Sequence, residues 1–391
     1  MNLNFLNLHA LISHSSSCLN RDDMNMQKSA HFGGVRRIRV SSQCLKRAIR
    51  MSQRYRELFG APSTRTRQDN DLFNHFRRLE RFNSYSDGTL RLIISVSNMA
   101  NKVVTPWIAD EMEHLATIAK NYIDEKTITE EELIALLENT DESDEKEDSD
   151  KKKKGKGKKG SKNNHLEGLT KALEKGSKEY LAAGISCTDI ALSGRMCASG
   201  ILQNVEGALS MAHSITTHAM EAEIDWFTAM DDLKEEAAEE AGAGHLNSQE
   251  FGAGVFYRYA SINMKLLTEN LGGDSTRALE TAKGFTELFA TVVPTGKQRS
   301  FASYSLADLV FVVRSPMPIA LHNAFEKPVR ARKTEGFMQP SINALAEYWE
   351  KIHRGYGLEE ESAVFSLHDT PFMDQTEQKG KLSDLLNWIG R

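Results

Sequence analysis

The chain is 391 residues long, carries a formal net charge of −5, and is 40% hydrophobic and 26% charged. With a mean hydropathy of −0.46, this composition excludes global disorder and membrane residence, because no apolar run approaches the roughly 20 residues of a spanning helix. Four scattered cysteines without a CxxC pair exclude a disulfide framework and the usual zinc spacings. We therefore expect a cytoplasmic protein of two or three domains without a signal peptide.

The first 60 residues form a basic segment on an acidic chain. They contain ten lysines and arginines against three acids, so the segment has a charge of +7. Charge separated in this way predicts a polyanion held at one place, most simply a nucleic acid. The ten cations are Arg21, Lys28, Arg36, Arg37, Arg39, Lys46, Arg47, Arg50, Arg54 and Arg56.

Two alternating stretches in this segment precede a helical one. Residues 6–12 place aliphatic side chains on one face and Asn7 and His9 on the other, which is typical of a strand. Residues 37–40 alternate again, with cations opposite aliphatics. From Ser41 the apolar spacing becomes helical, and we expect this helix to end at Gly60.

We expect residues 61–185 to form a separate, mainly helical unit. The Thr-Pro pair at 105–106 has the pattern of a helix start, and Thr-x-x-Glu at 129–132 is that of a capping box. Residues 141–164 are first acidic and then lysine-rich. Because this insert cannot bury apolar area, we expect it to be disordered.

The second half predicts mixed structure around an acidic, glycine- and alanine-rich stretch at 221–254. Outside this stretch and the helical unit, the elements follow the order β-α-β-β-α-β, which is the ferredoxin-like arrangement of RNA-recognition sheets. The sequence therefore predicts an α+β fold interrupted by two excursions. The expected later elements are strands at 210–218, 255–262 and 309–313, and helices at 275–292 and 340–353.

The start of the helix at Ser41 is the most specific candidate site. Ser41 or Ser42 can cap it, and the free backbone N–H groups and the helix dipole attract a phosphate. Gln43 adds an uncharged donor, and Lys46 and Arg50 add cations one and two turns along. The alternative is an ordinary surface helix with a solvated basic face. Nearby cations favour nucleic-acid binding by the whole group; they are Arg21, Lys28, Arg37 and Arg39.

Other residues allow competing interpretations. Asp22 and Asp23 could be metal ligands of a phosphodiesterase, but adjacent carboxylates point apart, and pairing with nearby arginines is the expected role. His213 and His218 lie five residues apart, on opposite faces of a predicted strand, which disfavours a shared metal. Met196 lies in a glycine-flanked turn, where the residues alone favour a core methionine over an exposed one that wedges against a base. We expect no metal and no cofactor.

Long stretches of the chain resemble the CasC family, the repeated backbone subunit of the type I-E CRISPR surveillance complex, Cascade. The resemblance runs from the N-terminus to about residue 345 and is weak only in residues 61–165. The matching stretches are ISHSSSCLNRDDMNMQK, FGGVRRIRVSSQCLKRA, ALSGRMCASG, AHSITTH, IDWFTAMDDL, QEFGAGVFYRYASIN, ENLGG, VPTGKQR, and NAFEKPV with MQPSI.

The resemblance implies a subunit shaped like a right hand. A modified RRM palm at 1–60 and 212–391 would carry helical fingers at 61–211 and a thumb at 223–253. Copies would stack head to tail along the spacer of one CRISPR RNA, six in the family complex, beside other Cascade subunits. Each thumb would kink the RNA bound by a neighbour, and the remaining bases would pair with target DNA in antiviral defence.

The resemblance also implies a set of RNA contacts and a non-catalytic role. Met196 matches a family methionine that packs at the kink, and IDWFTAMDDL would supply an apolar wedge. The alternative function is a metal-dependent ribonuclease using Asp22 or Asp23, because related backbone subunits of other CRISPR types cut RNA with an aspartate. The implied RNA contacts are Arg21, Lys28, Ser41, Gln43, Lys46, Arg50 and Met196, with Lys297 and Arg299 as weaker candidates.

Overall fold

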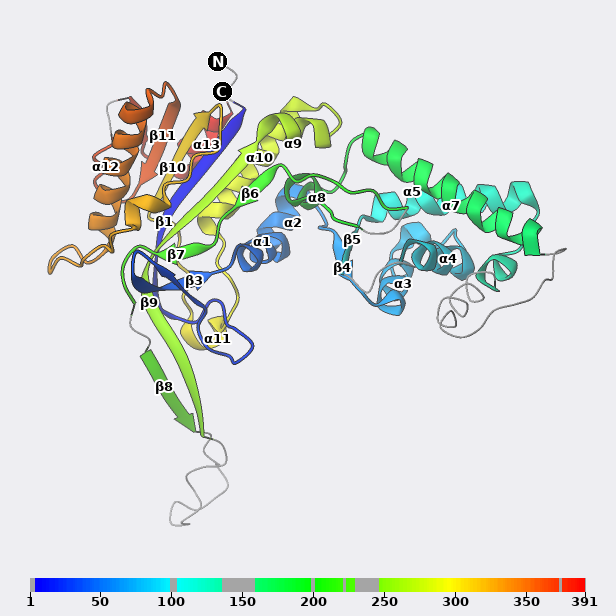
Figure 1. The fold of residues 1–391 in the computed structure, drawn as a ribbon, viewed down its shortest axis with the longest axis horizontal. Helices are drawn as coiled ribbons and strands as arrows, with labels where there is room; N and C mark the ends of the chain where they lie inside the picture. Colours follow the sequence, from blue (N-terminus) through cyan, green and yellow to red (C-terminus); the bar gives the residue numbers. More distant parts are fainter. Residues whose placement is uncertain are drawn as a thin grey trace, which may run out of the picture. The chain divides into compact units, whose positions relative to one another are not determined.

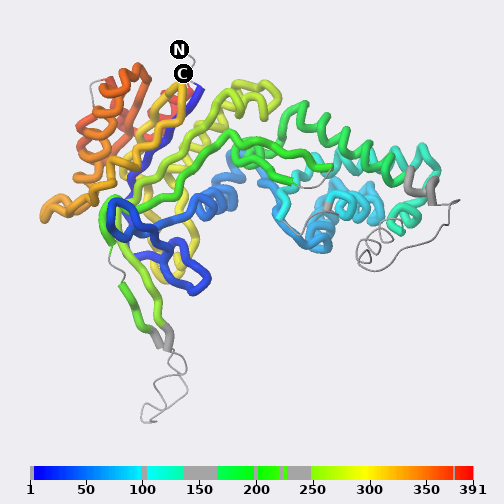
Figure 2. Tube along the Cα trace, in the orientation of Figure 1, coloured from blue at the N-terminus to red at the C-terminus, as the bar shows by residue number. Residues whose placement is uncertain are grey.

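The computed structural model of the chain contains two compact units (Figure 1). The first comprises Met1–Leu58, Leu209–Lys265 and Ala278–Arg391, and the second comprises Phe59–Ala208 and Leu266–Arg277. Figure 2 follows the chain by colour from one unit to the other and back. The residues that the structure describes are 4–98, 104–135, 159–197, 201–220, 223–228, 246–372 and 375–390.

A mixed sheet, ten-stranded in the described part of the chain, forms the centre of the first unit. Its strands are β1 (Phe5–Ser17), β2 (Ser29–Phe32), β3 (Val35–Val40), β6 (Leu209–Met211), β7 (Ser214–Thr216), β8 (Glu223–Thr228), β9 (Leu246–Asn263), β10 (Leu309–Ser315), β11 (Glu361–Ser366) and β12 (Thr376–Lys379). The order is β12-β11-β10-β1-β9-β7-β3-β2, with β6 and β8 paired to β9 beside this path. The β11–β12 pair is parallel, whereas β1 pairs antiparallel with both β9 and β10.

The predicted β-α-β-β-α-β order is present in this unit. It is formed by β1, α1 (Ser42–Met51), β7, β9, α10 (Ser275–Thr291), whose first three residues belong to the other unit, and β10. The four strands lie in the order β10-β1-β9-β7, and each neighbouring pair is antiparallel. The predicted α+β class is confirmed. The strand expected at 210–218 is instead two short strands, β6 and β7, each paired with β9.

Both faces of the sheet are covered. Alternate residues of β1 face opposite sides, so Leu11 packs in one core cluster with Trp349 of α12 (Met338–Tyr356). Its neighbour Ile12 packs in another cluster with Leu45 of α1. In Figure 1 the orange helix α12 lies along β10 and β11. The remaining helices of this unit are α2 (Gln53–Phe59), α11 (Gln298–Phe301), η2 (His322–Phe325) and α13 (Leu382–Ile389).

The helix expected from Ser41 to Gly60 is two helices. α1 ends at Met51, and the hydroxyl of its C-cap Ser52 donates to the carbonyl of Ile49 at 2.8 Å and accepts from the N–H of Tyr55 at 3.1 Å. A serine that satisfies backbone groups on both sides replaces the helical ladder locally. The second helix ends before Gly60 as expected, and that glycine has a φ of +79°.

The second unit is mainly helical, around a core of leucine, isoleucine and aromatic side chains. Two short strands, β4 (Thr64–Thr66) and β5 (Thr105–Trp107), form a separate ladder. The helices are α3 (Asp69–Arg77), η1 (Glu80–Phe82), α4 (Asp87–Asn98), α5 (Ala109–Lys126), α7 (Lys159–Ala182), α8 (Thr188–Ser193) and α9 (Met264–Asn270), whose first two residues belong to the other unit.

Three local expectations in this unit have different outcomes. The Thr-Pro pair at 105–106 does not start a helix, because it pairs with β4 and a proline also fits a short edge strand. The capping box is confirmed: the hydroxyl of Thr129 accepts from the N–H of Glu132, whose carboxylate accepts from the N–H of Thr129. The insert prediction is wrong for residues 159–164, which form the start of α7. Residues 136–158 lie outside the described residues.

β8 and β9 form a hairpin that extends from the sheet of the first unit. Glu223 pairs with Phe251 at one end of the ladder, and Thr228 pairs with Leu246 at the other. The paired residues of this hairpin lie within the expected thumb at 223–253, whose residues 229–245 lie outside the described residues. No helix in the described ranges has the length and apolar character needed to cross a bilayer.

Candidate nucleic-acid interface

The N-terminus of α1 is tied to two other segments. Ser41 is its cap: the hydroxyl accepts from the N–H of Cys44 at 3.3 Å, and the Ser41 N–H donates to the side chain of Asn20 at 2.8 Å. The N–H of Ser42 donates to Nδ1 of His213 at 2.9 Å. Burial, with Arg39 and Lys28 nearby, lowers the pKa of His213, which keeps this nitrogen an acceptor at neutral pH.

These contacts modify the predicted phosphate site. Two of the first N–H groups of α1, those of Ser42 and Cys44, already have partners within the protein. Ser41 is 7% exposed, whereas Gln43 is exposed and Lys46 and Arg50 are half-buried. A phosphate at this helix start would therefore be bound mainly by side-chain donors and cations, and less by backbone N–H groups.

The loop between β1 and β2 is held by its own side chains. The carboxylate of Asp22 accepts from the N–H groups of Met24 and Met26, both at 2.9 Å. Arg21 donates to the side chain of Asn25 at 3.0 Å, and the N–H of Lys28 donates to the carbonyl of Asn20 at 2.9 Å. The expected pairing of Asp22 with an arginine is absent from the ion pairs of the described residues, because this carboxylate folds the loop instead.

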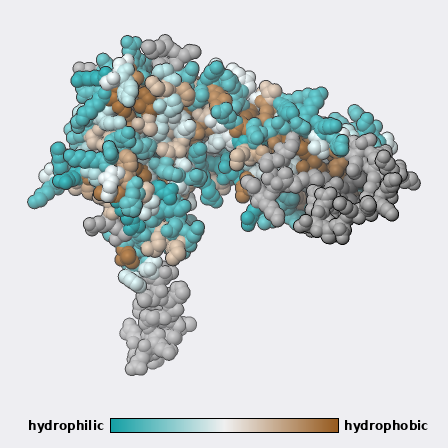
Figure 3. Space-filling model, in the orientation of Figure 1, coloured by the Kyte–Doolittle hydropathy of each residue, from teal (hydrophilic) through white to brown (hydrophobic). Residues whose placement is uncertain are grey.

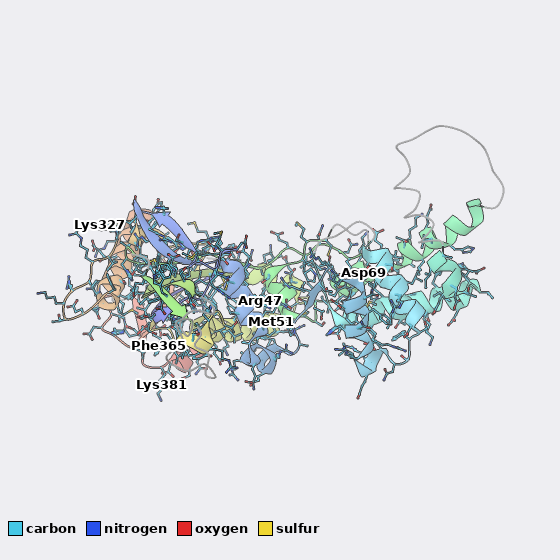
Figure 4. The ribbon with its side chains drawn as sticks, turned by 90° about the horizontal axis from the view of Figure 1, so that it is seen from below. Arg47, Met51, Asp69, Lys327, Phe365 and Lys381 are labelled. Atoms are coloured by element: carbon cyan, nitrogen blue, oxygen red, sulfur yellow. The ribbon has the colours of Figure 1, made fainter. Side chains whose placement is uncertain are left out.

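A cavity of about 300 Å³ lies between this loop and α1. Its walls are the loop at 19–25, the side of α1 that carries Cys44, Arg47 and Ala48, and the loop at 294–296. Arg47 is exposed and has no hydrogen bond or ion pair with the described residues. Figure 4 shows Arg47 and Met51 on the same helix, which is α1. We call this hollow the α1 cavity.

The loop containing Lys297 packs directly on the basic segment. A Cβ on Gly296 would lie 2.7 Å from the carbonyl oxygen of Leu19, so the two backbones are in close contact. Lys297 follows in a left-handed conformation and lies near Cys18, where it and Arg21 oppose the rise that burial causes in the pKa of the Cys18 thiol. The folded chain therefore brings Lys297 to the basic segment, although apart from Arg299 no cation lies close to it in sequence. Arg299 is exposed in α11.

Two of the three cations of β3 have structural roles. Arg37 is completely buried and donates to the carbonyl oxygens of Phe32, Thr216 and Phe325 at 3.2, 3.0 and 2.8 Å. The prediction that its side chain joins the nucleic-acid surface is wrong, because its donors satisfy buried backbone acceptors. Arg36 forms an ion pair at 2.7 Å with the buried carboxylate of Glu250 on β9.

Met196 lies in the second unit and is 82% exposed. The interpretation of this residue as a core methionine is therefore wrong. Its neighbour Arg195 pairs with Val205 in an isolated bridge, and the side chain of Arg195 is buried against Glu111. The remainder of the glycine-flanked turn, residues 198–200, lies outside the described residues.

The two histidines considered for a metal have other partners. Nε2 of His218 accepts from the N–H of Val255 at 3.2 Å, and its ring stacks on Phe337 at 3.8 Å between centroids. His213 accepts from Ser42, as described above. Among the described residues, no cluster of three histidine, cysteine or acidic side chains has a metal-binding arrangement.

A family comparison decides the relationship of this chain to known proteins. The model of the CT1975-like proteins, a Cas family, matches residues 6–388. The chain belongs to this family. No curated protein sequence matches it.

Solved structures share the fold of this CT1975-like chain. A chain of a CRISPR RNA-guided surveillance complex, pre-nicking, matches with a TM-score of 0.73 and 26% identity over 99% of both chains. A chain of another CRISPR RNA-guided surveillance complex matches with a TM-score of 0.59 and 22% identity, over 99% of this chain and 98% of that one, and shows the fold alone.

Arg47 is a candidate site residue of this CT1975-like chain that was not predicted from the sequence. The sequence marks it only as one of the ten basic residues of the first 60, whereas the predicted contacts Lys46 and Arg50 share one side of the helix. Arg47 lies on the adjacent side, and only the folded loops at 19–25 and 294–296 turn that side into a cavity wall. The four-residue spacing of Arg47 and Met51 predicts that they share a second side of the helix. It does not predict which segments of the chain face that side.

Proposed function

We propose that this protein is a non-catalytic, CRISPR RNA-binding subunit of a Cascade-type surveillance complex. The observation that carries the proposal is the convergence of Arg21, Arg47 and Lys297 around α1, in a CT1975-like chain whose fold matches a surveillance-complex chain over 99% of its length. Such a patch holds the sugar–phosphate backbone and does not read sequence. A subunit that carries guides of arbitrary sequence requires this property.

Because both faces of the sheet are covered, we expect the nucleic acid to bind at loops rather than on the sheet. RNA-recognition sheets stack bases on exposed aromatic side chains. In this chain Tyr257 and Phe311 share a buried cluster with Trp349 of α12, so they are not available to bases. The nucleic acid therefore binds beside the sheet, at the loop of Arg21, the exposed side of α1 and the α1 cavity. Hydrophilic residues cover most of the visible face of this unit (Figure 3).

In finer detail, we propose the type I-E backbone role of the CasC family in the cytoplasm. The first unit serves as the palm, the helical unit as the fingers and the β8–β9 hairpin as the thumb. Copies bind head to tail along one guide, and this heterologous contact does not close on itself, so RNA length or other Cascade subunits limit the filament. Ile224 and Trp226 of β8, 54% and 66% exposed, and Met196 supply apolar wedges that unstack the guide. The other bases pair with target DNA.

Native mass spectrometry of the particle purified from its host tests this proposal. We expect short, discrete guides and a fixed number of copies of this chain per guide. Protein that lacks such guides, and that ignores them when supplied, contradicts the proposed function. A generic single-strand binder would instead carry variable numbers of copies.

The ribonuclease alternative has its own test. The carboxylate of Asp22 already accepts two backbone N–H groups, which supports a structural role. We expect no cleavage when the loaded particle is incubated with complementary RNA and magnesium or manganese. Cleavage at regular spacing, abolished by Asp22→Ala or Asp23→Ala, would establish the ribonuclease.

A further inference from the structure

The backbone on both sides of Met196 is bonded to residues 204 and 205, and Arg195 and Val205 form an isolated bridge, here called the Arg195 bridge. The N–H and carbonyl of Arg195 bond to the carbonyl and N–H of Val205 at 2.9 and 2.8 Å, and the N–H of Cys197 donates to the side chain of Asn204 at 2.6 Å. Successive side chains of extended backbone point to opposite sides. Because Arg195 and Cys197 point inward, at 2% and 8% exposure, Met196 points outward.

One buried carboxylate holds the inward side chain of the Arg195 bridge. Glu111 of α5 is 1% exposed and accepts from both terminal nitrogens of Arg195, the longer contact being 3.0 Å. It also accepts from the hydroxyl of Ser177 of α7 at 2.8 Å. The Nε of Arg195 donates to the carbonyl of Gln203 at 3.0 Å, so the same guanidinium is also tied to the segment that contains Val205.

The ion pair of Glu111 and Arg195 fixes a direction. A buried ion pair contributes little net stability relative to apolar residues of similar volume, but its fork geometry holds the guanidinium in one orientation. Here the pair joins α5 and α7 to the inward side chain that precedes Met196. A change in the direction of Arg195 would shift the Arg195 bridge and move the exposed methionine with it.

We propose that Glu111, acting through Arg195, is a positioning residue that aims Met196 at the nucleic acid. The inference rests on the proposed function, in which Met196 unstacks a guide base. Glu111 itself does not touch the RNA. Its role is to hold the wedge at one angle, so that a base is displaced at each bound copy.

The test uses full-length protein assembled on guides with 2-aminopurine at successive positions, whose fluorescence rises where a base is unstacked. We expect Met196→Ala to lower the fluorescence at the positions that are bright in the parent protein. The double variant Glu111→Leu with Arg195→Met replaces the pair by apolar volume, so it should keep the melting temperature and the salt dependence of RNA binding. It should nevertheless lose the bright positions as Met196→Ala does. A purely structural pair would leave the fluorescence pattern unchanged in this variant.

Separate results overturn the two proposals. If Met196→Ala dims the positions and the stable double variant does not, the positioning role is wrong and the RNA-binding function stands. If Met196→Ala leaves the pattern intact on bound guide, the wedge role fails, and with it the role of Glu111. If circular dichroism shows the double variant unfolded, Glu111→Gln measured below its own melting temperature takes its place, with the same loss expected and an unchanged pattern contradicting it.

Discussion

Replacing Arg47 with alanine gives a quantitative test of the α1 cavity. This side chain is exposed, lines the cavity and has no hydrogen bond or ion pair with the described residues. Its removal should therefore change the free energy of unfolding by less than about 0.5 kcal/mol. Any larger effect on RNA binding then reports a lost contact with the ligand rather than a damaged fold.

The expected effect follows from counterion release. One phosphate contact to a single strand contributes about 0.7 to the negative slope of log affinity against log salt. Between about 50 and 200 mM salt, a fourfold change, the affinity of the parent should fall about 2.6-fold more than that of Arg47→Ala for each bound copy. We expect a similar reduction in slope for Lys46→Ala.

The assay is fluorescence polarisation of a labelled single-stranded RNA over a salt series. Arg56→Ala is the matched control, because Arg56 is an exposed arginine of α2 that does not line the cavity. Its slope should equal that of the parent. An unchanged slope in Arg47→Ala, or an equal reduction in Arg56→Ala, would refute the inference that Arg47 contacts a phosphate at the cavity wall.

Two further predictions concern stability. Ser41→Ala should lower the free energy of unfolding by about 1 kcal/mol, because the cap of α1 is lost. Ser41→Gly should lower it by only a few tenths of a kcal/mol. Thermal melts that do not separate the two variants would contradict the capping role. Burial lowers the pKa values of His9 and His14 to about 3, so between pH 6.5 and 3 the unfolded chain binds protons that the folded chain does not. Stability should fall as the pH decreases through this window, by up to about 1.4 kcal/mol per pH unit for each histidine; urea titrations that give the same free energy at pH 6.5 and 5 contradict this.

Features that depend on neighbouring residues could be predicted from the sequence. The strand at 6–12, the cap at Ser41 and the capping box at Thr129 are each confirmed, because period and local hydrogen bonds need only a few adjacent residues. The same local reasoning failed where two structures share one pattern. The Thr-Pro pair at 105–106 fits both a helix start and a strand, and pairing with distant β4 selects the strand.

The roles of the cations were decided by long-range packing. Arg37 and Arg47 have the same charge and both belong to the basic segment of the sequence. Arg37 is buried because three carbonyls, two of them from residues 216 and 325, converge on its guanidinium. Arg47 remains exposed, at a cavity wall formed partly by residues 294–296.

The sequence by itself determined the charge of this protein, its α+β elements and the helix start that carries four of the candidate RNA contacts, Ser41, Gln43, Lys46 and Arg50. Only the tertiary structure decided which cations reach solvent, that α12 covers one face of the sheet, and that Met196 points outward above a buried ion pair. The physical reason is distance along the chain. Hydrogen-bond period and capping depend on residues a few positions apart, whereas burial depends on contacts between segments up to about 300 residues apart, such as Arg37 and Phe325.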